Sequence, residues 1–363
     1  MAHVTVVGGG VIGLLAAREL RAAGLDVSVL DRGQIGRESS WAGSGILSPL
    51  HPWRQPDAVQ PLSLWSQRAY PDLAATLAAE SGIDPQLHVS GLLLPECPDA
   101  HVARAWASRW EVPLEELAAA AMRRAEPALA PHASGLLLPQ VAQVRNPRLM
   151  RALRIALQKA GVVFEEQHEV LGFVQRNDRI VALDTRHGRR SVDVLLVAAG
   201  AWSGELLRAC GLDLPIQPVR GQILALQTEP GLIRHVVLAE DHYLVPRRDG
   251  LLLVGSTVEH SGFDKTPSPG AAVTLRAAAA RLVPALAGTP QVAHWAGLRP
   301  GSPDGTPYIG RHPQIENVYV SAGHYRSGLT LAPASAALVS ALITARQSPV
   351  DGAAYCLDRP AVV

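Results

Sequence analysis

The start of the chain carries the feature that most limits how it can fold. An apolar, β-branched run leads directly into Gly8-x-Gly10-x-x-Gly13, and the residues after it have helical spacing. A second β-like run then ends at Asp31. This strand–turn–helix–strand order is the context that a dinucleotide-binding fingerprint requires. The sequence therefore predicts an α/β fold with a Rossmann-like nucleotide domain.

Each fingerprint residue has a physical role. We expect Gly8 to allow the tight turn, Gly10 to let the backbone approach a pyrophosphate, and Gly13 to allow close packing of helix on strand. Asp31 can accept hydrogen bonds from an adenosine ribose. Glycine-rich turns are common by themselves, so the prediction of a dinucleotide site depends on the surrounding strands and helix.

The segments that follow favour a flavin dinucleotide over NAD. A nicotinamide domain would continue with alternating strands and helices after Asp31. Instead, residues 39–49 are small and hydroxyl-rich, as in a loop that covers a ligand. The next convincing buried strand lies in residues 192–202. A nucleotide domain assembled from such distant pieces suits an elongated FAD molecule better.

A second informative segment, residues 295–330, combines arginines with glycine-rich turns. Arg299 follows an apolar stretch, and Arg326 lies in a glycine-flanked turn before an Ala-rich helix. A helix N-terminus after a glycine turn favours anionic or electron-rich groups. An arginine can bind a carboxylate through two parallel hydrogen bonds.

Composition narrows the functional class. The chain has 363 residues, 48% of them hydrophobic, and a net charge of +1, so we expect a large core and no nucleic-acid partner. Cys97, Cys210 and Cys356 are far apart, which is typical of free thiols in a reduced compartment. The histidines show no metal-ligand spacing, and no metal is expected. We expect no signal peptide, no apolar run of membrane-spanning length and no membrane partner, hence a cytoplasmic protein.

The pattern of segments predicts two interleaved domains. An FAD-binding domain would comprise residues 1–83, 146–217 and 304–363, and an antiparallel-sheet substrate domain would comprise 84–145 and 218–303. Within the second domain, the similar runs at 90–96 and 134–140 read as two strands of one sheet. Asp249-Gly250 is a hairpin signal. Residues 99–125 read as a solvated helix or a pair of helices.

Motifs along the whole chain resemble the D-amino-acid oxidase superfamily of FAD enzymes, and within it the glycine oxidases of thiamine biosynthesis. They are VVGGGVIG, ESSWAGSGILSP, LLVAAGAWSGEL, PVRGQILAL, HYLVPRRDG, WAGLRPGSPDGTPYIGRHP and GHYRSGLTLAP. The resemblance implies oxidative deamination of glycine, sarcosine or small D-amino acids, with O2 as acceptor and H2O2 as product. It also implies a homotetramer.

The resemblance also implies the roles of several side chains. Arg299 would bind the substrate carboxylate with help from the Tyr243 hydroxyl. The residues themselves leave alternatives open, because Arg299 could instead form a salt bridge to Asp304 or Glu240. Tyr243 could be an ordinary core residue. Arg326 could line the site as a second cation, contact the flavin, or only cap its turn.

The predicted cofactor contacts come from the fingerprint, the hydroxyl-rich loop and the C-terminal turn. Serines 39 and 40 would donate to the pyrophosphate, Val170 would contact the adenine side through its backbone, and His324 would be structural rather than catalytic. Ser44 replaces the Gly or Ala of relatives, so its hydroxyl would touch the flavin or narrow the substrate space. FAD would be non-covalent, since the C-terminal turn has no cysteine. The predicted contacts are Gly8, Gly10, Val11, Ile12, Gly13, Asp31, Arg32, Ser39, Ser40, Ser44, Gly45, Ile46, Val170, Ala199, Gly200, His324, Tyr325, Arg326, Ser327, Gly328, Leu329 and Thr330.

Two other functions fit parts of this pattern. A D-amino-acid dehydrogenase that passes electrons to a quinone would share the fold and the arginine motif. A non-enzymatic binding protein with a dinucleotide fold would share the fingerprint, but it would not need Arg299, Tyr243 and the C-terminal turn together.

Overall fold

The nucleotide fingerprint lies at the centre of a six-stranded sheet. The computed structural model describes residues 3–359. β1 pairs in parallel with both β12 and β2, and β19 and β8 extend the parallel order, whereas β18 is antiparallel. In spatial order the strands are β18 (Tyr308–Arg311), β19 (Val318–Ala322), β12 (Val194–Val197), β1 (His3–Val7), β2 (Asp26–Leu30) and β8 (Val163–Glu165). The predicted Rossmann-like α/β fold is confirmed.

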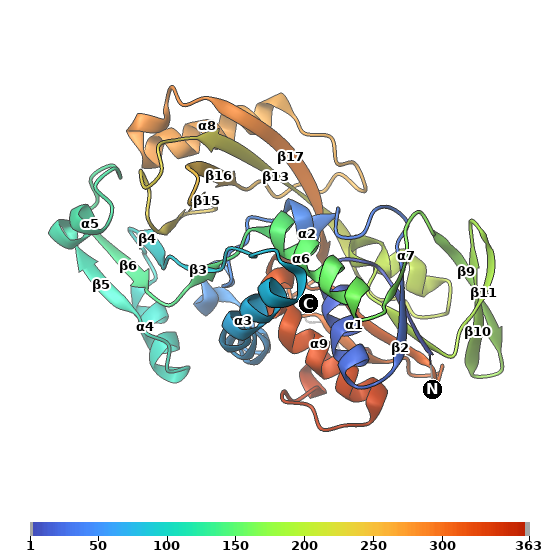
Figure 1. Ribbon diagram of the computed structural model, residues 1–363. Helices are drawn as coiled ribbons and strands as arrows, with labels where there is room; N and C mark the ends of the chain where they lie inside the picture. The colour runs from blue at the N-terminus through green and yellow to red at the C-terminus, as the bar shows by residue number, and fades with distance from the viewer. Residues whose placement is uncertain (1–2, 360–363) are drawn as a thin grey trace.

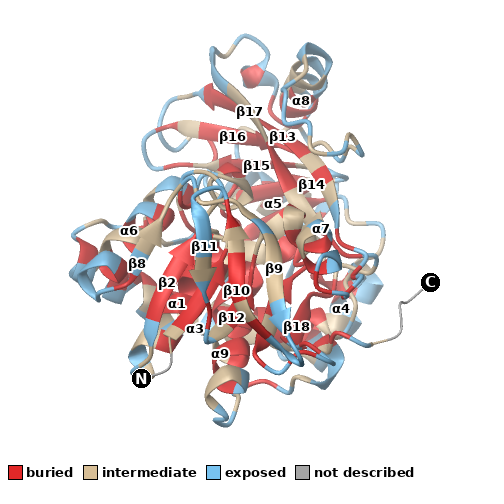
Figure 2. Cartoon of the chain, turned by 90° about the vertical axis from the view of Figure 1, so that its right-hand side faces the viewer, coloured by how far each residue is buried: buried red, intermediate tan, exposed pale blue. Residues whose placement is uncertain are grey.

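Helices cover one face of this sheet and a small sheet with a short helix covers the other. The helices bury their apolar positions in one core cluster with β1 and β2. They are α1 (Val11–Ala22), α3 (Val59–Ser81), α6 (Asn146–Lys159) and α9 (Gly328–Thr344). The opposite face packs against β9 (Val170–Arg176), β10 (Arg179–Thr185) and α7 (Ser203–Arg208), and β11 (Gly188–Ser191) pairs with β10 at the edge of the small sheet. Figure 2 shows that α1 and β12 are largely buried, whereas β9 and β11 carry exposed residues.

α9 corrects one sequence prediction. The span Tyr325–Thr344 has a mean hydropathy of 1.5 and is long and apolar enough to cross a membrane by length and composition. The expectation that no apolar run reaches that length is therefore wrong for this span. In the structure 61% of the span's most apolar stretch is buried, and the helix packs against α1 and α3. Its many Ala and Ser residues allow this close helix packing.

A larger, eight-stranded sheet lies beside the first, with α8 (Pro269–Leu282) packed on its outer side (Figure 1). In spatial order its strands are β17 (Gln291–Gly301), β13 (Gln217–Gln227), β16 (Leu251–Gly255), β15 (His242–Pro246), β14 (Val236–Ala239), β4 (Leu92–Pro95), β6 (Ser134–Leu138) and β5 (Glu115–Ala118). β14 and β4 are parallel, so the expected antiparallel sheet is in fact mixed. β14 follows β4 by more than a hundred residues, and a connection of this length allows the two strands to run in the same direction.

Several local predictions can be compared with this sheet. The two similar runs form the neighbouring strands β4 and β6, as predicted. Asp249-Gly250 does join β15 to β16. Residues 99–125 contain the expected helices α4 (Ala100–Arg109) and α5 (Ala119–Ala125), but also β5, which the helical composition concealed. The domain boundaries stay a prediction.

The short elements connect these layers. They are α2 (Ser39–Ala42), η1 (Pro52–Arg54), β3 (His88–Val89), β7 (Ala142–Gln143), η2 (Gly200–Trp202), η3 (Pro284–Leu286), η4 (Tyr325–Ser327) and η5 (Ala353–Tyr355).

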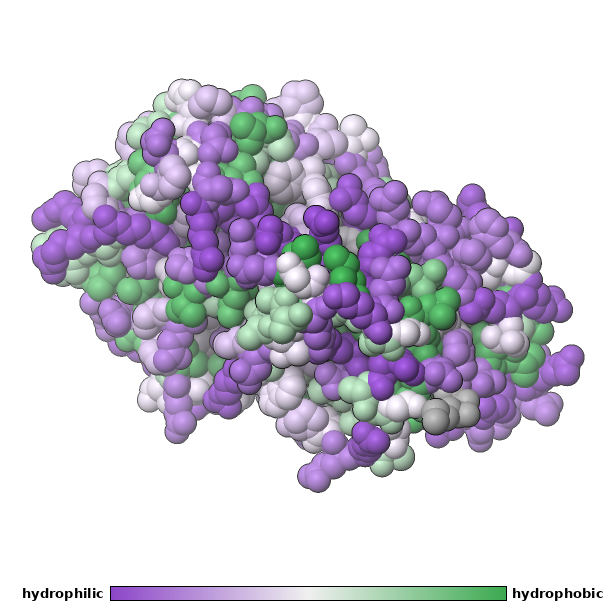
Figure 3. All heavy atoms as spheres, in the orientation of Figure 1, coloured by the Kyte–Doolittle hydropathy of each residue, from purple (hydrophilic) through white to green (hydrophobic). Residues whose placement is uncertain are grey.

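On the face seen in Figure 3, hydrophobic residues form small groups between hydrophilic ones. The exposed apolar side chains are thus dispersed over this face.

Candidate active site

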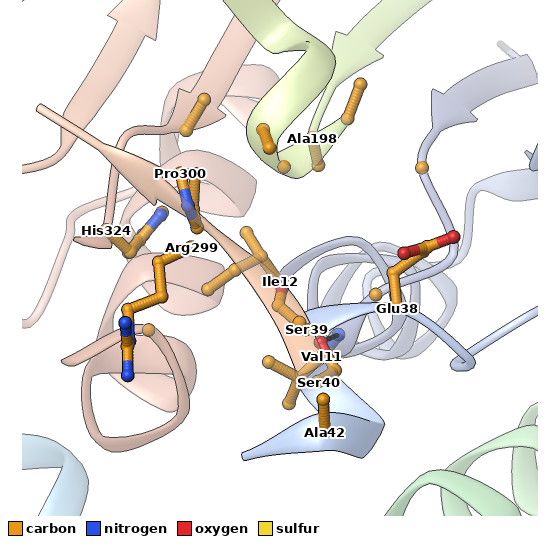
Figure 4. Close-up of a pocket in the computed structure, with 18 of the residues that line it drawn as sticks. Val11, Ile12, Glu38, Ser39, Ser40, Ala42, Ala198, Arg299, Pro300 and His324 are labelled. Carbon is orange, nitrogen blue, oxygen red and sulfur yellow. Dashed lines mark hydrogen bonds between the residues drawn. The ribbon is translucent and has the colours of Figure 1, made fainter. Parts of the chain in front are cut away.

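A cavity of about 440 Å³ lies where the two large sheets meet, and it collects most of the predicted site residues. Tyr243 and Arg299 line it from the eight-stranded sheet. All of the predicted cofactor residues line it except Gly13, Ser327 and Thr330. Figure 4 shows Arg299 and His324 on one side of the cavity and Glu38 on the other.

Glycine is required in the turn between β1 and α1. Gly8 has a φ of +112°, and a Cβ there would lie less than 3.0 Å from the carbonyl of Ala198. A Cβ at Gly13 would similarly overlap the Gly8 carbonyl. Gly13 therefore lets α1 pack against the turn instead of facing a ligand. Gly10 is the N-cap residue of α1, and it lines the cavity.

Asp31 ties this turn together. Its carboxylate accepts 2.8 Å hydrogen bonds from the backbone N–H groups of Gly9 and Gly33. Burial raises the pKa of Asp31, because desolvation outweighs these two hydrogen bonds. Each carboxylate oxygen can accept more than one hydrogen bond, so Asp31 can still receive a ligand hydroxyl.

The hydroxyl-rich loop contributes polar groups that face the same turn. Ser40 Oγ accepts a 2.9 Å hydrogen bond from the N–H of Val11, so its own proton is available to a ligand. Asn146 donates to the Ser40 carbonyl at 2.7 Å. Its own Oδ1 is buried without a hydrogen-bond partner in the described residues. Sequence reasoning missed Asn146, because its contact with the loop is tertiary.

An aromatic stack lies at the end of the cavity near Arg32. The Arg32 guanidinium lies 4.7 Å from the centroid of the Trp202 ring. Phe263 stacks on the same ring at 5.5 Å, and Lys265 pairs with Glu38 at 2.8 Å. The segment between β16 and α8 thus reaches across to the nucleotide-binding sheet. Trp202 and Glu38 are further cavity residues that sequence reasoning missed.

Arg299, on β17, contacts only neutral acceptors. Its guanidinium donates to Ser256 Oγ at 2.8 Å and to the Thr257 carbonyl at 3.1 Å. Burial lowers the pKa of Arg299 from its usual range, although nearby Tyr243 acts in the opposite direction. Within residues 3–359 it has no ion pair. Its positive charge therefore faces the cavity without a protein anion.

The two suggested salt-bridge partners of Arg299 are occupied elsewhere. Asp304 pairs with Arg359 at 2.8 Å, and Glu240 pairs with Arg281 at 3.2 Å. Both alternatives from the sequence are therefore wrong. Neither carboxylate lines the cavity.

Two strand glycines make room for the Arg299 and Tyr243 side chains. A Cβ at Gly221 would lie less than 3.0 Å from the guanidinium of Arg299, and one at Gly255 would meet the phenol ring of Tyr243 equally closely. Gly255 is the cross-strand partner of Tyr243. Glycine inside a strand often marks such a close approach. That signal could have identified both positions from the sequence.

Tyr243 and His324 both line the cavity but differ in their hydrogen bonding. Tyr243 is 5% exposed, lines the cavity, and its hydroxyl has no hydrogen bond within the described chain. His324 is bonded through Nε2 to Ser335 Oγ at 3.0 Å, and burial lowers its pKa to about 3. His324 is therefore neutral near pH 7 and held by the core. Arg326 is exposed and lines the cavity, so capping alone does not account for it.

Charge is distributed unevenly along the cavity. Its acidic lining residues, Asp31, Glu38, Glu169 and Glu205, all belong to the nucleotide-binding part or its aromatic end. The part bounded by Arg299 and Arg326 has no lining carboxylate among the described residues. This end suits an anionic ligand.

Comparisons with known proteins define the class. A family model described as "FAD dependent oxidoreductase" matches residues 3–342, and the chain belongs to this family. It is 49% identical to the glycine oxidase of Pseudomonas aeruginosa over 97% of this chain and 98% of that protein.

Two further relatives extend the likeness. The chain is 35% identical to the "Bifunctional protein ThiO/ThiG" of Synechocystis over 94% of this chain and 51% of that protein. The crystal structure of glycine oxidase from Geobacillus kaustophilus superposes with a TM-score of 0.94 at 32% identity, covering 99% of this chain and 100% of that one.

The residues present fit FAD, the cofactor of this family. The glycine turn offers a backbone cradle at the N-terminus of α1, where a side chain at Gly8 would collide with the backbone of Ala198 and Ala199, directly after β12. The buried Asn146 Oδ1 and the free Ser40 proton supply unused hydrogen-bonding capacity beside it. An elongated cavity then leads from this cradle to Arg299.

Proposed function

We propose that the protein is an oxidase that converts glycine, water and O2 to glyoxylate, ammonia and H2O2. Bound FAD would supply the acceptor for the two electrons and hydride of the substrate Cα–H bond and the reductant for O2. The observation that carries the proposal is the Arg299 guanidinium, which faces the cavity without a protein anion and beside the free Tyr243 hydroxyl. Glycine oxidases at up to 49% identity support this choice of substrate.

The side chains act by binding and orientation. Arg299 holds the substrate carboxylate through two N–H groups, and Tyr243 donates a further hydrogen bond. Fixing the carboxylate at one end directs the Cα–H bond, which is an effective source of rate enhancement. Arg326 adds a second positive charge near the carboxylate. His324 is buried and bonded to Ser335, and its lowered pKa makes it a poor base, so we assign it no proton transfer.

The loop around Ser44 sets the size of the substrate. Ser44, Gly45 and Ile46 line the cavity together with Ile223 of β13. We propose that these side chains leave room for glycine first, and for sarcosine or a small D-amino acid next. The other predicted cofactor residues that line the cavity would hold FAD along the glycine turn, the serine loop and the turn at 324–330, whereas Gly13, Ser327 and Thr330 do not line it.

The biological setting is proposed from relatives. Similarity to a bifunctional ThiO/ThiG protein, together with the resemblance to glycine oxidases of thiamine biosynthesis, supports a role in supplying glycine imine for the thiazole of thiamine. We further propose a homotetrameric cytoplasmic enzyme with the two interleaved domains given above.

An anaerobic absorbance spectrum of the purified protein tests the proposal. We expect a flavin spectrum that glycine bleaches and that air restores with release of H2O2. Bleaching by sarcosine or a D-amino acid but not by glycine would move the substrate. A flavin that none of these compounds bleaches would refute the proposal of an amino-acid oxidase. Comparing the turnover rate with O2 and with a quinone analogue identifies the electron acceptor.

A further inference from the structure

Arg247 is a buried cation behind the cavity wall. It follows β15 and is 8% exposed. Its guanidinium reaches from the eight-stranded sheet into the serine loop and donates at 2.7 Å to the Ser44 carbonyl. It also donates to Gln143 Oε1 at 2.6 Å and to the Val144 carbonyl at 2.9 Å. One side chain thus joins three segments that are far apart in the sequence.

The charge of Arg247 is not neutralised locally. None of the described carboxylates forms an ion pair with it. The charged groups that act on it are Arg145 and Asp249, and these two pair with each other at 2.6 Å. Burial lowers its pKa to about 10, so the guanidinium remains protonated near pH 7. Burying a charge beside neutral acceptors alone costs folding free energy, whereas an apolar side chain of similar length would fill the same space without that cost.

The wall that Arg247 supports is close to the cavity. Ser44, Gly45 and Ile46 all line it. Gly45 has a φ of +82° and accepts a hydrogen bond from the N–H of Val144 at 2.9 Å. A Cβ at Gly45 would lie 3.1 Å from Nη2 of Arg247. The guanidinium is therefore one backbone thickness from the cavity.

We propose that Arg247 is a positioning residue that fixes the Ser44–Ile46 wall against FAD and raises the reduction potential of the cofactor through its uncompensated positive charge. A cation behind this wall favours the more negative, reduced form of a bound flavin. The inference deepens the proposed function but rests only on FAD binding, and not on which substrate is oxidised.

Three variants separate the charge from the hydrogen bonds. Arg247→Met removes both at nearly constant length, and Arg247→Lys keeps the charge but loses the forked contact with Ser44 and Val144. Arg248→Met is the matched control, because Arg248 is the adjacent arginine and is exposed. The measurements are the midpoint potential of the holoprotein by dye equilibration and the FAD dissociation constant by flavin fluorescence.

We expect Arg247→Met to weaken FAD binding at least tenfold and to make the midpoint potential more negative. Arg247→Lys should return the potential most of the way to that of the parent protein while FAD binding stays weakened. Arg248→Met should change neither quantity.

A parent-like potential in Arg247→Met would overturn the electrostatic role, and parent-like FAD binding would overturn the positioning role. If Arg247→Met does not fold, Arg247→Lys decides, because unchanged FAD affinity in that variant contradicts the proposal. Neither measurement contains substrate. A holoprotein that shows these shifts but is not bleached by glycine, sarcosine or a small D-amino acid would refute the proposed function alone.

Discussion

Replacing Arg299 by methionine should separate ligand binding from folding. In the folded chain the guanidinium contacts the neutral acceptors of Ser256 and Thr257, with no anion among the described residues. A half-buried cation without a partner destabilises a protein, and an apolar side chain of similar length does not carry that cost. We therefore expect the free energy of unfolding of Arg299→Met, measured without substrate, to be equal to or higher than that of the parent.

The catalytic effect should be large and in the opposite direction. The structure leaves Arg299 able to offer two charge-assisted hydrogen bonds to a substrate carboxylate. Taking about 1.5 kcal/mol for each gives a loss of about 3 kcal/mol, or roughly 150-fold in kcat/KM. Steady-state O2 consumption with glycine measures kcat/KM, and urea unfolding of the same preparation measures stability.

Two controls make the Arg299 result specific. Arg299→Lys keeps the charge but not the fork, so it should lie between the parent and Arg299→Met. Glycolate, which has the carboxylate but no oxidisable amine, should perturb the flavin spectrum of the parent and not that of Arg299→Met. Unchanged kcat/KM for glycine in Arg299→Met would refute the assignment of Arg299 to the carboxylate.

Three other substitutions follow from the same geometry. Gly221→Ala should displace the Arg299 guanidinium and raise KM for glycine more than tenfold, with FAD affinity unchanged; an unchanged KM would show that the close approach is unimportant. Tyr243→Phe should remove one hydrogen bond to the substrate, worth about 1 kcal/mol, and so raise KM roughly fivefold. Thermal stability should change little, because no described group bonds the Tyr243 hydroxyl. A large loss of stability would indicate a structural role instead. His324→Gln tests the burial of a neutral imidazole. In the unfolded chain His324 takes up a proton below about pH 6.5, whereas in the folded chain it does so only near pH 3. The free energy of unfolding of the parent therefore falls as pH drops through this window, by up to about 1.4 kcal/mol per pH unit. Urea unfolding between pH 6.5 and 4 should show a shallower decline in the variant, which can keep a hydrogen bond to Ser335; parallel curves would contradict the assignment.

The nucleotide end of the fold could be predicted because its determinants are local. The turn at Gly8 needs a positive φ, and the helix and strand that flank it follow within a few residues. The hairpin at Asp249-Gly250 is equally local. By contrast, β14 joins β4 in parallel across more than a hundred residues, and nothing in either short strand specifies its partner. The sequence therefore indicated the strands of the larger sheet better than their order and direction.

The residues of the candidate site likewise differ in how well the sequence predicts them. Arg299 and Tyr243 lie in motifs that resemble a known family, so they could be named from the chain. Asn146 and Trp202 could not, because each contributes through contacts with segments far away in sequence. α9 is the instructive error, since alanine and serine lower the apparent apolarity of a stretch that packs as a core helix.

The placement of cations suits this cavity to the anionic ligand that we propose. Arg299 and Arg326 border an end without a lining carboxylate in the described chain, while Asp304 and Glu240 are paired with other arginines. If Asp304 instead reached Arg299, the free protein would gain an ion pair, but a substrate carboxylate would have to displace it. Keeping neutral acceptors such as Ser256 on the guanidinium orients the cation without neutralising it. Under the proposed function, the substrate carboxylate supplies the missing negative charge, and binding energy is concentrated on the group that would fix the orientation of Cα.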